Sequence, residues 1–289
     1  MSVNVKTMKL FFFAVIFTFA DLVISQRVIS LAPAITEIVF DLGKGETLVG
    51  VTKFCDYPPA AMKIAKIGGL LDMNMEAFLA LAPEIVIAYP EQNAKLRSLR
   101  LPLQILVVKH QCLADLFDSI FAIGSALHAE RNAKNMVLAM KNKLAVIADN
   151  AGHRSKIRTL IVAGRNADEL KNMYIIGKND FLNELLEIAG GVNAYQGAIN
   201  YPNISLEGVI FLNPDLIIEI SAHYEGISDE KVFALWQPFT MIAAVRKRQI
   251  RIIKESFWLR PGSRVGLVAA EMAGILSFVN HAEKPDSGD

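Results

Sequence analysis

The chain alternates short apolar runs with stretches of helical length. Seven runs rich in Val, Ile and Leu are continuous, which is typical of strands that are buried on both faces of a sheet. They cover residues 27–31, 46–52, 84–89, 103–109, 158–164, 215–221 and 250–254. Helical stretches such as 34–42 and 181–189 lie between them. This alternation of strands and helices predicts parallel sheets in an α/β architecture.

Two segments of the chain share one pattern at an offset of 131 residues (207 − 76 = 131). The first copy reads MEAFLALAPEIVI from residue 75, and the second reads LEGVIFLNPDLII from residue 206. In each copy a polar N-cap residue, Asn74 or Ser205, precedes a short helix, and a proline ends that helix before a buried strand. The repeat predicts two α/β halves and places Glu76 and Glu207 at equivalent positions, one in each half.

A long helix is predicted between the two halves. Residues 129–150 contain neither proline nor glycine, and the apolar residues Met136, Met140, Leu144 and Ile147 recur near helical spacing. At 1.5 Å per residue, this segment forms a helix about 33 Å long. A rigid helix between two halves limits their relative motion, unlike a Gly/Ser linker.

The N-terminus has the pattern of a secretory signal peptide. Lys6 and Lys9 precede an apolar run at 10–20 that is too short for a comfortable membrane span. We expect cleavage after Ser25, with cleavage after Ala20 or retention as an uncleaved anchor as the alternatives. No cysteine follows the apolar run, so a lipid-anchored form is not supported.

Composition and motifs exclude several functions. Apolar residues make up 53% of the 289 positions, which supports a sizeable core, and 30 basic against 29 acidic residues leave no nucleic-acid footprint. The chain has no Gly-x-Gly-x-x-Gly after a strand, no Gly-x-Ser-x-Gly, and no histidines at metal-ligand spacing. Neither catalysis nor a metal site is predicted. We expect Cys55 and Cys112 to be independent thiols, although an exported protein permits a disulfide.

Aromatic residues gather where predicted strands of both halves end. Ligands of open α/β sheets bind beyond the carboxyl ends of the strands, and aromatic side chains there suit a large, flat, partly apolar ligand. The predicted ligand-binding residues are Phe54, Tyr57, Tyr89, Tyr174, Tyr201 and Trp258, with Arg260 as a contact for an anionic or amide-rich ligand. For any one of these aromatic residues the alternative is a place in the core.

From residue 27 to about residue 277 the chain resembles the iron-chelate and vitamin B12 periplasmic-binding family. The resemblance is carried by RVISLAP at 27–33, DYP at 56–58, MNME at 73–76, the two repeats and RPGSR at 260–264. Within the family, the chain is most similar to the cobalamin-binding members. Leu70 stands where those members carry a tryptophan, and we include it among the ligand-binding residues.

The resemblance implies two Rossmann-like lobes bridged by a single long helix, the class III periplasmic-binding-protein fold. The implied division is a signal peptide at 1–25, an N-terminal lobe at 26–128, a bridging helix at 129–150, a C-terminal lobe at 151–280 and a tail at 281–289.

The implied function is that of a periplasmic solute-binding protein of an ABC importer, a monomer when free and without catalysis or cofactors. A cobalt corrinoid is the expected ligand, bound between the lobes and passed to a membrane permease that works with a cytoplasmic ATPase. Glu76 and Glu207 resemble the pair that docks to the permease. A ferric siderophore or heme is the alternative ligand, and a secreted α/β enzyme or a receptor-like module is the alternative class.

Overall fold

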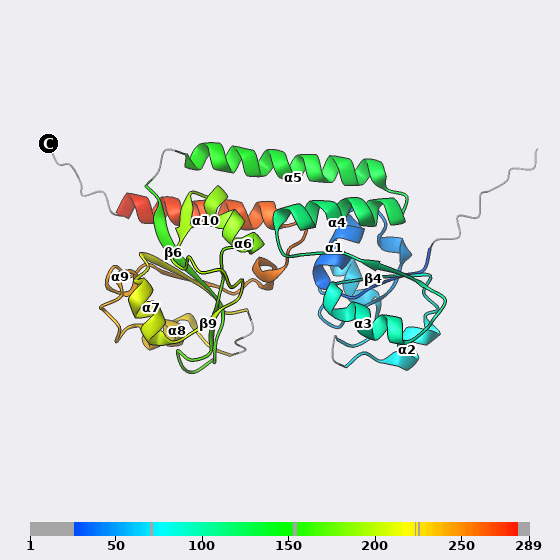
Figure 1. Ribbon diagram of the computed structural model, residues 1–289, viewed down its shortest axis with the longest axis horizontal. Coiled ribbons are helices and arrows are strands. Elements are labelled where there is room, and N and C mark those ends of the chain that lie inside the picture. Colours follow the sequence, from blue (N-terminus) through cyan, green and yellow to red (C-terminus); the bar gives the residue numbers. More distant parts are fainter. Residues whose placement is uncertain (1–25, 70–71, 153–154, 223, 225, 283–289) are drawn as a thin grey trace, which may run out of the picture.

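The computed structural model describes residues 26–69, 72–152, 155–222, 224 and 226–282. Two sheets, each with its own helices, lie side by side along the long axis of the molecule (Figure 1). The first sheet has the order β3-β2-β1-β4-β5, and all neighbouring strands are parallel. Its strands are β1 (Val28–Ser30), β2 (Leu48–Val51), β3 (Ala65–Lys66), β4 (Ile85–Ala88) and β5 (Gln104–Val107). This sheet and its helices form the N-terminal lobe.

The second sheet belongs to the C-terminal lobe and has the order β11-β10-β6-β7-β9, with β8 also paired to β6. Its strands are β6 (Ile157–Gly164), β7 (Met173–Ile175), β8 (Gly191–Asn193), β9 (Asn203–Ile204), β10 (Leu216–Ile220) and β11 (Ile250–Ile253). Strands β8, β10 and β11 continue the parallel pattern, but β7 is antiparallel to both β6 and β9. The prediction of parallel sheets is therefore confirmed for the predicted strands of both lobes. The unpredicted strand β7 is antiparallel, because the connection at 165–172 is too short for a parallel crossover.

All seven predicted strands are present, each within its predicted range or one residue longer. Four further strands, β3, β7, β8 and β9, have only two or three residues each. Such short segments show no apolar periodicity, so the sequence pattern did not predict them.

Helices cover the sheets of both lobes. Those of the N-terminal lobe are α1 (Pro33–Asp41), α2 (Met75–Ala80), α3 (Pro90–Ser98) and α4 (Leu113–Ala126). Those of the C-terminal lobe are α6 (Phe181–Ile188), α7 (Leu206–Leu212), α8 (Asp229–Trp236), α9 (Ala243–Arg246) and α10 (Val265–Ala282). The repeat helices α2 and α7 begin as predicted, because the side chains of Asn74 and Ser205 accept hydrogen bonds from the N–H groups of Ala77 and Gly208.

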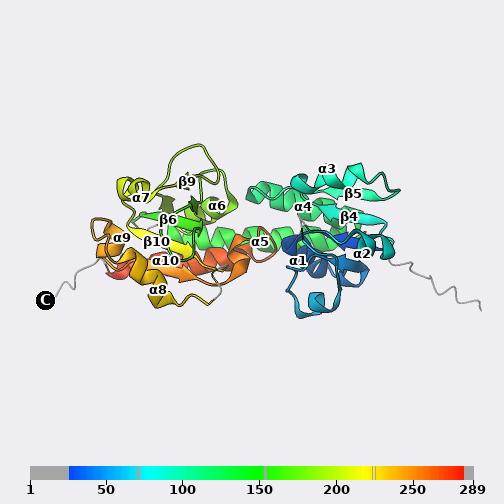
Figure 2. The ribbon, with the colours of Figure 1, turned by 90° about the horizontal axis from the view of Figure 1, so that it is seen from below.

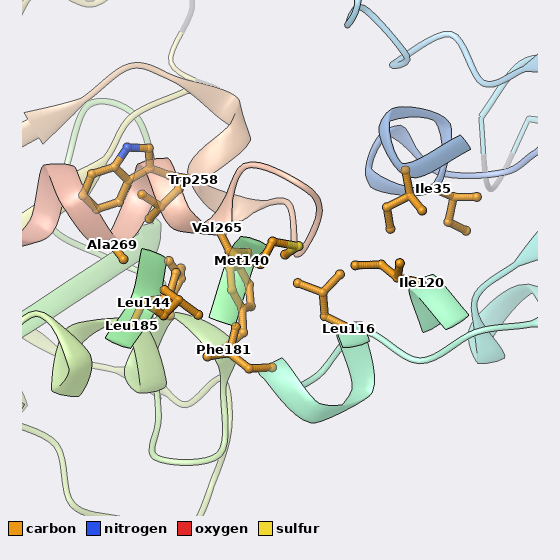
Figure 3. Packing of buried hydrophobic residues seen from close by; sticks show 14 of the residues in the cluster. Ile35, Leu116, Ile120, Met140, Leu144, Phe181, Leu185, Trp258, Val265 and Ala269 are labelled. Atoms are coloured by element: carbon orange, nitrogen blue, oxygen red, sulfur yellow. The ribbon is translucent and has the colours of Figure 1, made fainter. Parts of the chain in front are cut away.

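One long helix, α5 (Glu130–Ala151), runs along both lobes above α4 and α10 (Figures 1 and 2). Its bounds match the predicted bridging helix to within one residue at each end. Met140 and Leu144 of α5 belong to a hydrophobic cluster that includes Ile120 of α4 and Phe181 of α6 (Figure 3). The lobes therefore share one core along the bridging helix.

Both cysteines are free thiols, as expected. Cys55 is buried, and its sulfur lies 3.2 Å from the hydroxyl oxygens of Thr36 and of Thr52. Cys112 precedes α4, and its sulfur accepts a hydrogen bond of 3.4 Å from the backbone N–H of Asp115. The expected signal peptide at 1–25 lies outside the described residues. Within the described part of the chain, no helix is long and apolar enough to cross a membrane.

Candidate functional site

Four charged side chains join the two lobes, and we call them the inter-lobe ion-pair cluster. Glu37 lies on α1 and Asp56 follows β2, whereas Arg260 and Arg264 lie between β11 and α10. Arg264 donates to Glu37 through Nε (2.8 Å) and Nη2 (2.6 Å). Arg260 donates to Asp56 through Nη1 (2.6 Å) and Nη2 (3.1 Å), and its Nη1 lies 3.5 Å from Oε1 of Glu37. Each arginine therefore holds a carboxylate of the opposite lobe.

The cluster is buried at one end and open to solvent at the other. The side chain of Glu37 is 1% exposed, and that of Asp56 is 57% exposed. The hydrogen bond from Arg260 lowers the pKa of Asp56 below its usual range. The guanidinium of Arg264 lies 4.4 Å from the ring centroid of Tyr57 and 4.5 Å from that of Phe257, within the range of cation–π attraction. Tyr57 is thereby tied to the cluster.

The lobes also meet where α4 and α6 begin. The N–H of Phe181 donates to the carbonyl of Gln111 (2.8 Å), and the N–H of Leu113 donates to the carboxylate of Glu184 (3.0 Å). Each segment thus supplies an acceptor for an N–H group that has no partner within its own helix. This second contact also holds the two lobes in place relative to each other.

Two predicted ligand-binding tyrosines flank this second contact. Tyr89 lies in the N-terminal lobe, and its ring centroid is 4.0 Å from that of His110. Tyr201 lies in the C-terminal lobe, and its side chain hydrogen-bonds that of Asp180, the N-cap residue of α6. Burial raises the pKa of Asp180 to about 6, opposed by that hydrogen bond and by the charge of His110. The structure therefore brings Tyr89 and Tyr201 toward one junction from opposite lobes.

The raised pKa of Asp180 predicts a pH-dependent stability. In the unfolded chain an aspartate titrates near 3.9. Below pH 4 the carboxyl is protonated in both states, but between pH 4 and 6 only the unfolded chain has released its proton, so stability falls as pH rises and stays lower above 6. We expect Asp180→Asn, which keeps the helix cap, to raise the free energy of unfolding by about 2 kcal/mol at pH 7.5.

Urea denaturation of both proteins at pH 4 and pH 7.5 measures this difference. The gain should nearly vanish at pH 4, where Asp180 carries its proton. Asp41→Asn, on the exposed end of α1, is the matched control and should give little change at either pH. An Asp180→Asn gain of equal size at both pH values would contradict the assignment to this carboxyl.

Tyr174 and Phe54 are also accessible. Tyr174, on β7, is 50% exposed and lines a pocket of about 240 Å³ together with Arg165 and Tyr224. Arg165 is held by a buried ion pair of 2.6 Å with Glu219, at the ends of β6 and β10. Phe54 is 56% exposed. Each lobe therefore has an exposed aromatic side chain among the predicted ligand-binding residues.

Trp258 does not lie with these residues. Its side chain is fully buried, its Nε1 donates to Glu271 on α10 (2.7 Å), and it packs beside Ala269 (Figure 3). The structure therefore places the indole of Trp258 in the core with its only polar atom satisfied, and not among the accessible aromatic residues. Contact of Trp258 with the ligand stays a prediction. Leu70 lies outside the described residues.

The sequence motifs predict no functional role for Glu37, Asp56 or Arg264. A signal for Glu37 was available, because it is a lone carboxylate within the apolar stretch of α1. Asp56 and Arg264 lie in motifs that carried the resemblance. Their pairing joins residues more than 200 positions apart, which spacing along the chain does not show.

Glu76 and Glu207 are exposed in the first turns of α2 and α7. These helices lie in different lobes, and both lie on the side of the molecule away from α5 (Figure 1). A hydrogen bond from Ser205 lowers the pKa of Glu207, so this carboxylate is ionised at neutral pH. Neither glutamate touches the inter-lobe ion-pair cluster. Their places suit contact with an external partner better than contact with a ligand.

Two α/β lobes along one helix, with accessible tyrosines at their junction, define a two-lobed solute-binding protein. Residues 28–256 match the family model described as periplasmic binding protein, and the chain belongs to that family. Its members are solute-binding transport proteins, which confirms the expectation that the chain is not an enzyme. They bind solutes for transport and use no cofactor. Binding proteins of ABC importers work with permease and ATPase subunits.

Two relatives illustrate the sequence similarity. The chain is 30% identical over 199 residues to the uncharacterized ABC transporter substrate-binding lipoprotein YvrC of Bacillus subtilis (strain 168), covering 67% of this chain and 63% of that protein. It is 26% identical over 266 residues to the vitamin B12-binding protein of Vibrio cholerae serotype O1, covering 90% of this chain and 91% of that protein. These relatives are periplasmic or lipoprotein binding proteins.

Solved structures share the fold. The periplasmic heme-binding protein RhuT from Roseiflexus sp. RS-1 has a TM-score of 0.76 at 24% identity, covering 89% of this chain and 99% of that chain. The periplasmic vitamin B12-binding protein BtuF of Vibrio cholerae has a TM-score of 0.73 at 24% identity, covering 88% of this chain and 97% of that chain. The expected class III fold with two lobes is thereby confirmed.

Proposed function

We propose that this protein binds a corrinoid between its two lobes and delivers it to the permease of an ABC importer. The observation that carries the proposal is the set of accessible tyrosines on both sides of the junction. Tyr57 belongs to the N-terminal lobe, and Tyr174 and Tyr201 belong to the C-terminal lobe. Tyr89 adds a partly buried ring on the N-terminal side. Aromatic faces from two sides suit a large flat chelate. The full-length similarity to vitamin B12-binding proteins supports the corrinoid as ligand.

A ferric siderophore or heme is the second candidate ligand. The observation in its favour is the likeness in fold to heme-binding proteins, together with tyrosine hydroxyls at the junction. Phe54, Tyr57 and Tyr174 are exposed and would contact either kind of chelate. Arg260 would contact anionic or amide groups of the ligand once it shares or releases Asp56.

The proposal includes the organisation of the whole chain. Residues 1–25 would direct the protein to the periplasm and be removed. Residues 26–128 and 151–280 would then act as the two lobes of a monomer, joined by the helix at 129–150, with residues 281–289 as a tail. Glu76 and Glu207 would dock the loaded protein on the permease.

Absorption spectroscopy with equilibrium dialysis tests the ligand. Both tryptophans are fully buried, so the ligand's own visible bands are a more direct signal than protein fluorescence. The purified protein should bind one molecule of cobalamin or, in the second case, of heme or a ferric siderophore. A protein that binds none of the three would overturn the proposed function.

Variants at the junction test the site itself. Tyr57→Ala and Tyr201→Ala should each weaken ligand binding by roughly tenfold, because each removes an aromatic face from one lobe. Phe278→Ala, at an exposed aromatic residue on α10, is the matched control and should leave the affinity within about twofold. Equal effects at all three positions would show that the loss is general and not a property of the junction.

A further inference from the structure

A pocket of about 690 Å³ lies beside Glu207 in the C-terminal lobe, and we call it the Glu207 pocket. Three segments form it: the connection between β6 and β7, the segment from β9 into α7, and the end of α8 with the turn that follows. It is distinct from the smaller pocket at Tyr174, with which it shares only Asn172. The pocket therefore adjoins the proposed docking carboxylate without belonging to the junction between the lobes.

The rim of the Glu207 pocket is acidic. Asp168, Glu169 and Glu207 line it, and Lys171 is its one lysine, so the formal charge of these four groups is −2 (−3 + 1). Lys171 is already paired with Glu169 at 2.7 Å. This ion pair lowers the pKa of Glu169, and the bond from Ser205 lowers that of Glu207, so both are ionised at neutral pH. A partner that approaches this rim is favoured if it is basic.

The interior of the Glu207 pocket is largely apolar. Its apolar lining residues are Leu170, Ile204, Leu206, Ala234, Leu235, Pro238 and Phe239. Leu170 is buried, and Leu235 and Phe239 pack against the core of the lobe. An apolar side chain that enters this pocket is removed from water. Such burial in a pocket is the usual source of large contributions of single residues to binding free energy.

A second pocket on the same lobe has the opposite charge. It measures about 720 Å³ and is lined by Arg246, Arg248, Arg251 and Glu230, a formal charge of +2 (+3 − 1). The two pockets share Ala234 of α8. Because their volumes are similar and their charges opposite, a basic partner is attracted to the Glu207 pocket and repelled by the other one.

We propose that the Glu207 pocket receives a segment of the membrane permease that carries a basic side chain next to an apolar one. The basic side chain pairs with Glu207 and Asp168 at the rim, and the apolar side chain enters the pocket. The inference rests on the proposed docking role of Glu207. It adds that the permease holds the C-terminal lobe through the Glu207 pocket as well as through the charge of Glu207.

Two matched pairs of variants test the role of the Glu207 pocket. Pro238→Trp fills the Glu207 pocket, and Thr240→Trp, two residues along the same turn, fills the other pocket. Asp168→Lys reverses a charge on the acidic rim, and Glu230→Lys makes the same change on the basic one. The measurement is binding of each ligand-loaded variant to the purified permease–ATPase complex in nanodiscs, with stimulated ATP hydrolysis, ligand affinity and melting temperature in parallel.

Pro238→Trp and Asp168→Lys should weaken transporter binding by roughly tenfold or more, while Thr240→Trp and Glu230→Lys change it by less than about twofold. The Asp168→Lys effect should shrink at high salt. Normal binding by both Glu207-pocket variants overturns the inference, and so does equal loss in all four proteins. Self-association that Pro238→Trp abolishes also overturns it, since the occupant is then a second copy.

The role of the Glu207 pocket and the docking role of Glu207 can be tested separately. If Glu76→Ala with Glu207→Ala impairs transporter binding but the pocket variants do not, only the role of the Glu207 pocket in docking is rejected. If the double glutamate variant binds the transporter normally, the docking role itself is rejected, whatever the pocket variants do.

Discussion

Replacing Glu76 and Glu207 together by alanine is expected to abolish uptake of the ligand in cells and to leave ligand affinity nearly unchanged. Both carboxylates are exposed, on equivalent first turns of helices in different lobes. Exposed charges contribute at most about 1 kcal/mol to stability, so folding does not require them. A transporter with two-fold symmetry can meet one carboxylate on each lobe with the same basic group of each subunit. Losing both charges removes the attraction that orients the complex.

The test compares uptake in cells with ligand binding by the purified protein. Glu130→Ala with Asp149→Ala is the matched control, because it removes two exposed acidic residues at the two ends of α5, on the other side of the molecule (Figure 1). It should support normal uptake. Each single glutamate variant should retain part of the activity, and the effect of each substitution on transporter binding should shrink at high salt, where the attraction is already screened. A double glutamate variant that loses ligand affinity but still stimulates its transporter would show that these residues serve ligand capture.

Continuous apolar runs made the main strands predictable, because a strand buried on both faces has no polar alternation to obscure it. The repeat also predicted the capped helices α2 and α7, whose N-cap side chains are local in sequence. The reversal at β7 was not predictable from composition. It depends on a short connection between β6 and β7, and the pairing of these two strands is a tertiary contact that the local sequence pattern does not show.

The candidate site was predictable only in part. Tyrosines after strand ends were found because chain order gives the carboxyl end of a parallel sheet. Trp258 follows the same rule but is buried, since its neighbours on α10 come from a later segment that packs over it. The Glu37–Arg264 pair spans 227 positions, and no periodicity connects two such residues. Tertiary contacts of this kind decide which polar residues are structural.

The largest loss of stability from a single change is expected for Arg264→Met. The methionine keeps the length and apolar stem of the arginine, but Glu37 loses both short hydrogen bonds and retains only Arg260 at 3.5 Å. Removing one partner of a buried ion pair costs about 3–5 kcal/mol, and Arg264 is 20% exposed, so we expect a loss of about 3 kcal/mol at pH 7. Thermal and urea denaturation measure it.

Arg97→Met is the matched control, because Arg97 is exposed and its side chain donates to Asn93 on the surface of α3. It should cost less than about 0.5 kcal/mol. Glu37→Leu combined with Arg264→Met should recover most of the loss, since an apolar pair leaves no buried charge behind. A double variant as unstable as Arg264→Met would mean that the loss comes from the missing cation–π contacts to Tyr57 and Phe257 and not from the stranded carboxylate. The inter-lobe ion-pair cluster would then hold the lobes together by packing.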